Sequence, residues 1–219
     1  MEIFELAVKL LAGLKVTVTI TFCSALLALV AAFTAGLARL SKRAWLRVPA
    51  LVYIDLFRGT SALVQLFWAY FALPLFGIKL DALTVGIVVL GLNIGSYGAE
   101  VVRGAVQAVP RGQGDAAVAL NFTPSQAMRL IILPQALVAM LPPFGNLLIE
   151  LLKSTALVSL ITLSDLTFEA QILRSETLRS ADVFTMVLVM YFLVAQAMNR
   201  GVRYMEKRMT AGRDWGGVV

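Results

Sequence analysis

The sequence predicts an all-α polytopic membrane protein with about five transmembrane helices. The chain of 219 residues is 59% hydrophobic and only 15% charged, whereas about a quarter of a soluble domain is charged. Five runs without charge are long enough, or nearly so, to cross roughly 30 Å of hydrocarbon. The polar stretches between them are too short to enclose a second core. We therefore expect a single transmembrane domain over 1–219.

The predicted spans follow these runs in order. A run of 11 residues, 154–164, is too short to cross and is expected to be re-entrant or interfacial. The amphipathic residues 1–15 are expected to lie along the outer interface. A short helix after Arg43 is expected on the cytoplasmic face, with Gly59 and Thr60 marking its end. The expected spans are about 16–38, 59–78, 82–102, 130–152 and 183–202.

Basic residues are distributed unevenly between the two sides of these spans. Thirteen of the 19 Lys and Arg residues fall on one side. By the positive-inside rule this side is cytoplasmic, so the N-terminus is outside and the C-terminus cytoplasmic. This rule explains the net charge of +6 better than nucleic-acid binding does. The thirteen are Arg39, Lys42, Arg43, Arg47, Arg58, Arg103, Arg111, Arg129, Arg200, Arg203, Lys207, Arg208 and Arg213.

The composition excludes several classes of enzyme. The chain has no histidine and a single cysteine, Cys23. Ser-His hydrolysis is therefore impossible, and a His/Cys metal site has too few ligands. Asp55 and Asp165 fall on opposite sides of the predicted membrane and cannot act as a pair. We expect no catalytic residue, no metal site and no cofactor bound by this chain.

The predicted cytoplasmic connection 103–129 is long for a connector, and long ordered connectors tend to be functional. Pro110 suits the first turn of a helix, and Asp115 is expected near the positive end of its dipole. Asn121 tolerates the left-handed conformation that ends a helix. Thr123 and Pro124 suit the N-cap and first position of a second helix. The predicted first helix has a face of mostly small residues, which suits close approach by a partner or packing against the protein's own spans. This face consists of Ala116, Ala117, Ala119 and Leu120.

This segment resembles the EAA loop of permease subunits of bacterial ABC importers. The matching residues are Asp115-Ala116-Ala117, Asn121 and Ile132-Leu133-Pro134. Asp115 replaces the family's glutamate, and Asn121 replaces a glycine, which keeps tolerance of positive φ. Further resemblance to the polar amino-acid branch (the histidine/glutamine type) covers most of residues 10–200. The stretches are FRGTSALVQLF (57–67), YGAEVVRGAVQAVPRGQGDAA (97–117), ILPQAL (132–137) and LKSTALVSLITLSDLT (152–167).

The resemblance implies a function for the loop. In such permeases it forms a coupling helix that sits in a groove of a cytoplasmic ATPase subunit, here through Asp115, Ala116, Ala117, Leu120, Asn121 and Pro134. It implies a type I ABC importer permease in the bacterial cytoplasmic membrane. The implied partners are an ABC ATPase dimer that carries ATP and Mg²⁺, a second permease and an extracytoplasmic solute-binding protein. Consistently, the chain has no G-x-x-x-x-G-K-[ST] phosphate loop.

Polar residues inside predicted spans are candidates for the substrate pathway, because polar groups are costly at that depth. They are Gln65, Asn93, Asn146, Glu150 and Lys153. Glu150 and Lys153 are three residues apart, so they suit either an ion pair on one helix or a site for a zwitterion. Gly91 and Gly95 allow close helix packing, within the bundle or with another subunit.

We expect an ATP-driven importer of a polar amino acid or a related compatible solute. The region after Asn121 looks most like permeases of ectoine and hydroxyectoine. The alternative is an ATP-independent carrier or channel, which would need coupling-ion sites or an inverted repeat. No convincing repeat is present in the sequence.

Overall fold

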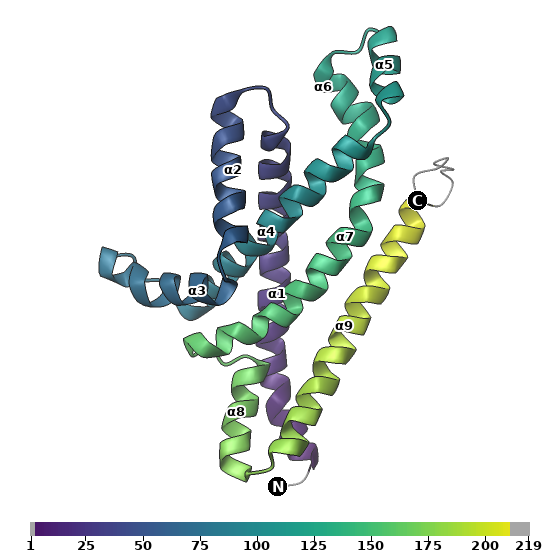
Figure 1. The fold of residues 1–219 in the computed structure, drawn as a ribbon. Coiled ribbons are helices and arrows are strands. Elements are labelled where there is room, and N and C mark those ends of the chain that lie inside the picture. The colour runs from purple at the N-terminus through teal and green to yellow at the C-terminus, as the bar shows by residue number, and fades with distance from the viewer. Residues whose placement is uncertain (1–2, 211–219) are drawn as a thin grey trace.

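The computed structural model describes residues 3–210, which are almost entirely helical (Figure 1). The predicted all-α architecture is confirmed. Four helical segments are long and apolar enough to cross a membrane, and a bent pair makes a fifth. The elements are α1 (Ile3–Arg39), α2 (Ala44–Gly59), α3 (Ala62–Phe67), η1 (Trp68–Ala72), η2 (Leu73–Phe76), α4 (Ala82–Ala108), α5 (Arg111–Ala119), α6 (Pro124–Ala127), η3 (Met128–Ile132), α7 (Leu133–Ser154), η4 (Thr155–Ile161), α8 (Leu166–Thr177) and α9 (Ser180–Thr210).

The centre of the bundle is the packing of α4 along α1. Small residues let the two backbones approach, since a Cβ at Gly91 would meet Leu27 and one at Gly95 would meet Ala31. The Gly91–Gly95 pair therefore serves packing within the bundle, which was one of its two predicted roles. Around this seam, Ile20, Leu90, Ile94, Leu151 and Val158 form one buried cluster that joins α1, α4, α7 and η4.

The N-terminal segment does not lie along an interface as predicted. Residues from Ile3 onward continue α1 without a break, giving a helix of 37 residues, or about 55 Å. Leu6 and Leu10 are buried against α8 and α9. The helix therefore extends past the predicted span 16–38 and forms a second core at this end.

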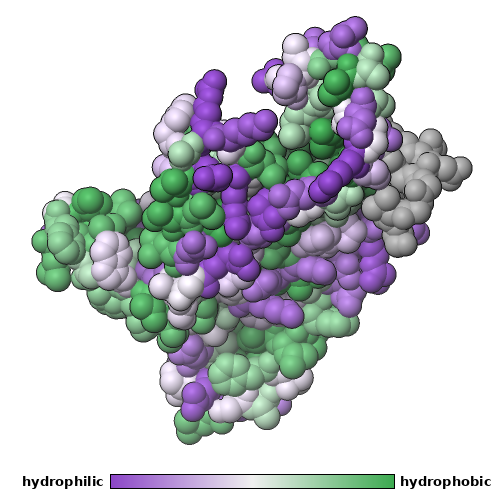
Figure 2. Space-filling model, turned by 45° about the horizontal axis from the view of Figure 1, so that its top comes forward, coloured by the Kyte–Doolittle hydropathy of each residue, from purple (hydrophilic) through white to green (hydrophobic). Residues whose placement is uncertain are grey.

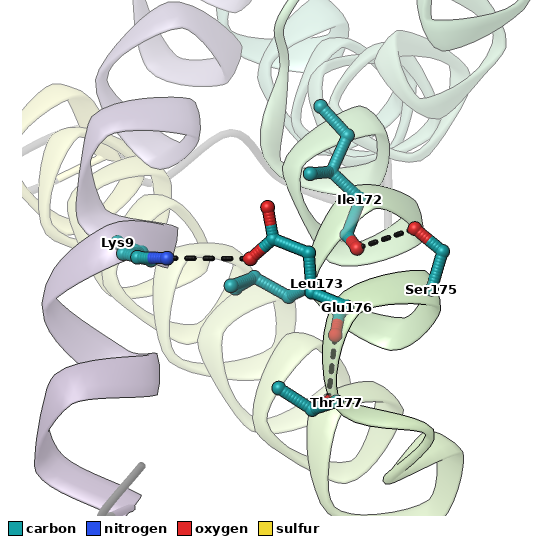
Figure 3. A network of polar contacts seen from close by, with 6 residues as sticks. All are labelled: Lys9, Ile172, Leu173, Ser175, Glu176 and Thr177. Carbon is teal, nitrogen blue, oxygen red and sulfur yellow. Dashed lines mark hydrogen bonds and ion pairs between the residues drawn. The ribbon is translucent and has the colours of Figure 1, made fainter.

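The segment between the last two predicted spans contains the helix α8. Asp165 caps it by accepting a hydrogen bond from the Phe168 backbone N–H. Lys9 of α1 forms an ion pair of 3.3 Å with Glu176 of α8, as Figure 3 shows. A Cβ at Gly13 would lie 2.7 Å from the Asp165 carbonyl oxygen, so α8 is pressed closely onto α1.

The second span differs from the predicted 59–78. It begins at Ala44, because α2 is not a surface helix but packs against α1 and α4 through Ala50 and Ile54. At Gly59 the direction turns by 104°, and the chain continues into α3, η1 and η2. Figure 1 shows this second part leaving the bundle sideways. The predicted break at Gly59–Thr60 is real, but it interrupts the span instead of preceding it.

Two π-helical turns stand immediately before prolines. The Leu73 N–H bonds to the Trp68 carbonyl just before Pro74, and the Leu133 N–H bonds to the Met128 carbonyl just before Pro134. Proline has no N–H and crowds the carbonyl four residues earlier. A wider turn relieves that clash while the helix continues. At Pro134 this local widening carries η3 into α7.

The ends of the helices agree with the predicted grouping of sides. The α1–α2 connection, α5, α6 and the end of α9 lie together, and α8 and the start of α1 lie at the opposite end (Figure 1). Two helices exceed their predicted spans, because α4 continues to Ala108 and α9 runs from Ser180 to Thr210. The short run 154–164 contains the 3₁₀ helix η4, which follows α7 directly. Of the basic residues used to predict the sides, Arg213 lies outside the described residues.

Candidate functional site

The predicted coupling loop consists of α5, a tight reversal and α6. Asn121 has φ 58° as predicted, and the Phe122 N–H bonds back to the Ala117 carbonyl at 3.0 Å. Thr123 begins α6 with a reciprocal capping box to Gln126, and Pro124 is at its first turn. The predicted helix–bend–helix is therefore present. Pro110 is the N-cap residue of α5, one position before the predicted one.

Three of the four residues of the predicted small face are exposed, and the exception is Ala117. Ala117 is fully buried, on the side where α5 packs back onto η3 and α6. Val118 is 71% exposed and Leu120 66% exposed. Asp115 is the fifth residue of α5, so it lies beyond the first turn, where the helix dipole would favour it. A polar helix with exposed Val and Leu presents a surface suited to a partner, and Val118 was not singled out from the sequence.

A hydrogen bond joins α5 to the long helix behind it. The Gln135 side-chain amide donates to the Gln113 side-chain oxygen at 3.3 Å and to the Ile131 carbonyl at 2.9 Å. Pro134, the last predicted coupling residue, stands beside Gln135 in the first turn of α7. A displacement of α5 would therefore be transmitted directly to the base of α7.

Gln65 and Asn93, two of the predicted pathway residues, meet at the break between α2 and α3. The Asn93 amide donates to the Gln65 side-chain oxygen and to the Phe57 carbonyl, both at 3.1 Å. The Gln65 amide donates to the same carbonyl at 3.0 Å and to the Thr60 hydroxyl at 2.6 Å. The two amides thus satisfy backbone groups that the break leaves open.

Charged side chains lie beside this break. The Arg58 guanidinium sits over the Tyr97 ring, with Cζ 5.2 Å from the ring centroid. Asp55 and Arg58 are both exposed, one turn apart on α2. The sequence placed them at the cytoplasmic surface because they border the run 59–78. Since α2 descends into the bundle, they lie instead at the depth of Asn93.

A second charged group lies further along α4. Glu100 pairs with Arg39 of α1 and, at 3.0 Å, with Arg103. Arg103 also donates to Gln107. Figure 2 shows hydrophilic residues as a band across a face that is otherwise largely hydrophobic, running toward the end that carries α5 and α6. The polar residues of α4 were not predicted as a stripe, although Asn93, Tyr97 and Glu100 have helical spacing.

The remaining predicted pathway residues share one stripe of α7. Asn146, Glu150 and Lys153 are exposed at positions i, i+4 and i+7. Among residues 3–210 the structure records no ion pair between Glu150 and Lys153. They do not meet the Gln65–Asn93 pair through any recorded contact within that range. A cavity of about 320 Å³ between α1, α7 and α9 is lined by apolar residues such as Phe33, Met140 and Leu148, so it does not suit a polar solute.

Asp165 is the most buried charged group. One of its oxygens caps α8, while Oδ2 is buried and has no hydrogen-bond partner among the described residues. Burial raises its pKa to about 6, and hydrogen bonds from Phe168 and Thr167 lower the pKa by less. Leu166 beside it donates its N–H to Thr17 of α1 at 3.1 Å. These hydrogen bonds fix the start of α8 and hold it against α1, at the end of the molecule opposite α5.

Comparisons with known proteins agree with this geometry. Residues 24–211 match the family described as "Binding-protein-dependent transport system inner membrane component". A probable amino-acid ABC transporter permease protein of Sinorhizobium fredii is 47% identical, over 92% of this chain and 87% of its own. The glutamine transport system permease protein of Escherichia coli (strain K12) is 34% identical, over 91% of this chain and 92% of its own.

Among solved structures, an amino acid ABC transporter crystallised with histidines is similar, with a TM-score of 0.85 and 34% identity. The match covers 91% of this chain and 94% of that one. The family match spans more than half of the sequence, and the relatives are aligned along nearly their whole length. The chain therefore belongs to the binding-protein-dependent transport system inner membrane components, the permease subunits of bacterial ABC transporters.

Proposed function

We propose that this chain is the membrane-spanning subunit of an importer driven by ATP hydrolysis on a separate subunit. Its cargo is a polar amino acid or a related zwitterionic compatible solute, carried into the cytoplasm. The family supports the transport role, and the names of the relatives from S. fredii and E. coli support amino acids as the substrate class. Ectoine remains one candidate within that class.

The exposed apolar face of α5 carries the proposal. Val118 of α5 and Leu120, its C-cap residue, are large exposed apolar residues at the end where basic residues gather. Such residues become favourable when a partner covers them. The cytoplasmic ATPase dimer would occupy this surface, and the Gln113–Gln135 contact would pass its movement to α7.

The remaining partners follow from the same reasoning. Five spans are too few to enclose a pathway, so a second permease, identical or similar, completes the pore. Exposed Asn146, Glu150 and Lys153 on α7 fit a water-filled path between the two, because charges are costly against lipid. An extracytoplasmic solute-binding protein would deliver the solute at the end formed by α8.

The experiment is purification of the tagged chain from its native membrane in mild detergent, followed by mass spectrometry of the proteins that accompany it. An ABC ATPase with a second permease supports a heterodimeric importer, and an ATPase alone supports a homodimer. An intact sample without any ATPase would contradict the coupling role of α5.

A double variant tests the surface itself. Val118→Asp with Leu120→Asp is expected to remove most of the ATPase and of ATP-coupled uptake, because each buried anchor of an interface contributes about 2 kcal/mol. Ser125→Asp is the matched control, since it adds a charge at an exposed position of the same loop outside α5. Ala117 is unsuitable for this purpose, because a bulky residue there would disrupt the loop itself.

A further inference from the structure

Arg58 lies near the middle of the bundle and not at its surface. The Tyr53 hydroxyl donates to the Leu92 carbonyl at 2.6 Å, and Asn93 bonds to the Phe57 carbonyl at 3.1 Å. These contacts fix the end of α2 beside residues 92–93, at the centre of the predicted span 82–102. An Arg side chain cannot reach water from there by extending along the helix to a membrane surface more than two turns away.

The break in the span does not require this charge. Its open carbonyls at Phe57 and Thr60 already accept hydrogen bonds from the amides of Gln65 and Asn93. Among residues 3–210 the structure records neither a hydrogen bond nor an ion pair for Arg58. Asp55, one turn away, is recorded without an ion pair as well. The guanidinium is held by its face against Tyr97.

That arrangement leaves the N–H groups at the edge of the guanidinium free. A planar guanidinium stacked on an aromatic ring presents a rigid fork of donors that matches a carboxylate in two parallel hydrogen bonds. More than a third of the residue is exposed, and an unpaired cation at this depth faces water or a second protein, because lipid disfavours it.

We propose that Arg58, stacked on Tyr97 at the break between α2 and α3, binds the carboxylate of the transported solute. This assignment rests on the proposed function and adds a residue to it. Asp55 lies on the same face of α2, one turn before Arg58. The ammonium group of the same zwitterion therefore has an acidic group within reach. The competing occupant is a carboxylate of the second permease.

The single cysteine of the chain makes a direct test possible. Ser61→Cys, at an exposed position three residues after Arg58, is introduced together with Cys23→Ala, and membranes containing the whole complex are treated with the anionic reagent 2-sulfonatoethyl methanethiosulfonate. With Arg58 present we expect rapid labelling, slowed at least about tenfold by a millimolar mixture of the twenty L-amino acids with ectoine, and unaffected by choline, which has no carboxylate. With Arg58→Gln in the same chain, the mixture should no longer slow the labelling.

Each alternative gives a different result. A cysteine that does not react lies in lipid or in a dry subunit interface, and the proposal is then wrong. If the chain that keeps Arg58 is labelled at the same rate with and without the mixture, or if Arg58→Gln leaves the protection unchanged, the proposal is also wrong. Uptake of the same amino acids by the wild-type complex separates the two claims: if the wild type transports none, the proposed function fails, and if it transports them without protecting the cysteine, only the role of Arg58 fails.

Uptake by variants gives a second readout. Arg58→Gln is expected to lower uptake at least about tenfold, while Arg58→Lys keeps a larger share because it retains the charge without the fork. Treatment of a separate Arg58→Cys, Cys23→Ala variant with 2-aminoethyl methanethiosulfonate, which restores a cation at position 58, should recover part of the uptake. Arg47→Gln is the matched control: Arg47 is exposed on α2, eleven residues and so about three turns away on nearly the same face. A loss in Arg47→Gln equal to that in Arg58→Gln would contradict a specific site.

Discussion

At the break of the second span, two polar residues that were predicted to line a pathway have a structural role. Gln65 and Asn93 were predicted to line a pathway because both stand in apolar runs. In the structure they bond to each other and to the Phe57 carbonyl. The sequence pattern locates a buried polar residue but does not identify its hydrogen-bond partner. Here the partner is a backbone carbonyl that becomes available only at the bend between α2 and α3, and tertiary contacts create that bend.

This role predicts a cost in stability. Asn93→Leu should destabilise the protein by about 1–3 kcal/mol, because it removes a donor and leaves the Phe57 carbonyl with a single amide partner. The measurement is the midpoint of thermal unfolding in detergent. Asn146→Leu is the control, since Asn146 is exposed on α7 and should change the midpoint little. Equal midpoints for the two variants would contradict the structural role of Asn93.

Asp165 predicts a dependence of stability on pH. Its folded pKa, about 6, is above its usual value of 3.8, so the native state favours the protonated carboxyl. Stability is therefore fully retained below pH 4 and falls as the pH rises to 6. Asp165→Asn keeps the cap and removes the charge, so it should stabilise the protein by about 1–3 kcal/mol at pH 7.5. The gain should vanish near pH 4 in thermal unfolding, and a gain that does not change with pH would contradict a buried charge.

At the scale of elements, the apolar runs predicted α1, α4, α7 and α9 well, because hydrophobicity decides which segments enter a membrane. The second span was misplaced, since Asp55 and Arg58 interrupt its apolar run. The helix α8 was missed, although Leu166, Ala170 and Leu173 have helical spacing and Asp165 is a good N-cap. Its charged surface residues obscured that signal.

Close packing between elements predicts opposite effects of one substitution at two glycines. At Gly36 of α1 an added Cβ would lie 2.7 Å from the Ala99 carbonyl oxygen, whereas at Gly104 of α4 nothing lies within 4 Å. Gly36→Ala should therefore lower the unfolding temperature by separating α1 from α4. Gly104→Ala should raise it, by about 1 kcal/mol in stability, because alanine favours the helix. If both variants are stabilised, the α1–α4 contact is looser than described.

At the scale of the whole molecule, the proposed function makes the described chain one part of a pore. The loop geometry was well predicted, because Asn121, Thr123 and Pro124 act through local chemistry. The burial of Ala117 was not, since it depends on how α5 packs onto η3. The charged stripe of α7 was predicted from residue type, but only the structure shows that it is exposed and lacks a recorded partner within residues 3–210.

That stripe predicts contact across the pore. Glu150→Cys combined with Cys23→Ala, with a cysteine at the corresponding position of the second permease where that subunit is not identical, should form a disulfide or be joined by a short bifunctional reagent to it, giving a product of about twice the mass on a gel. Leu193→Cys, on an exposed apolar position of α9, should give none. An intact complex in which position 150 never cross-links would place α7 away from the second subunit.

The cluster that joins α1, α8 and α9 has a consequence for how the protein is made. Leu6 and Leu10 are covered by Leu166, Leu173, Val183 and Val187, residues that are synthesised long after them. The start of α1 therefore stays uncovered until α8 and the start of α9 have been made. A polypeptide cut short before α8 would insert and still expose that end, which offers membrane proteases a way to tell finished subunits from unfinished ones.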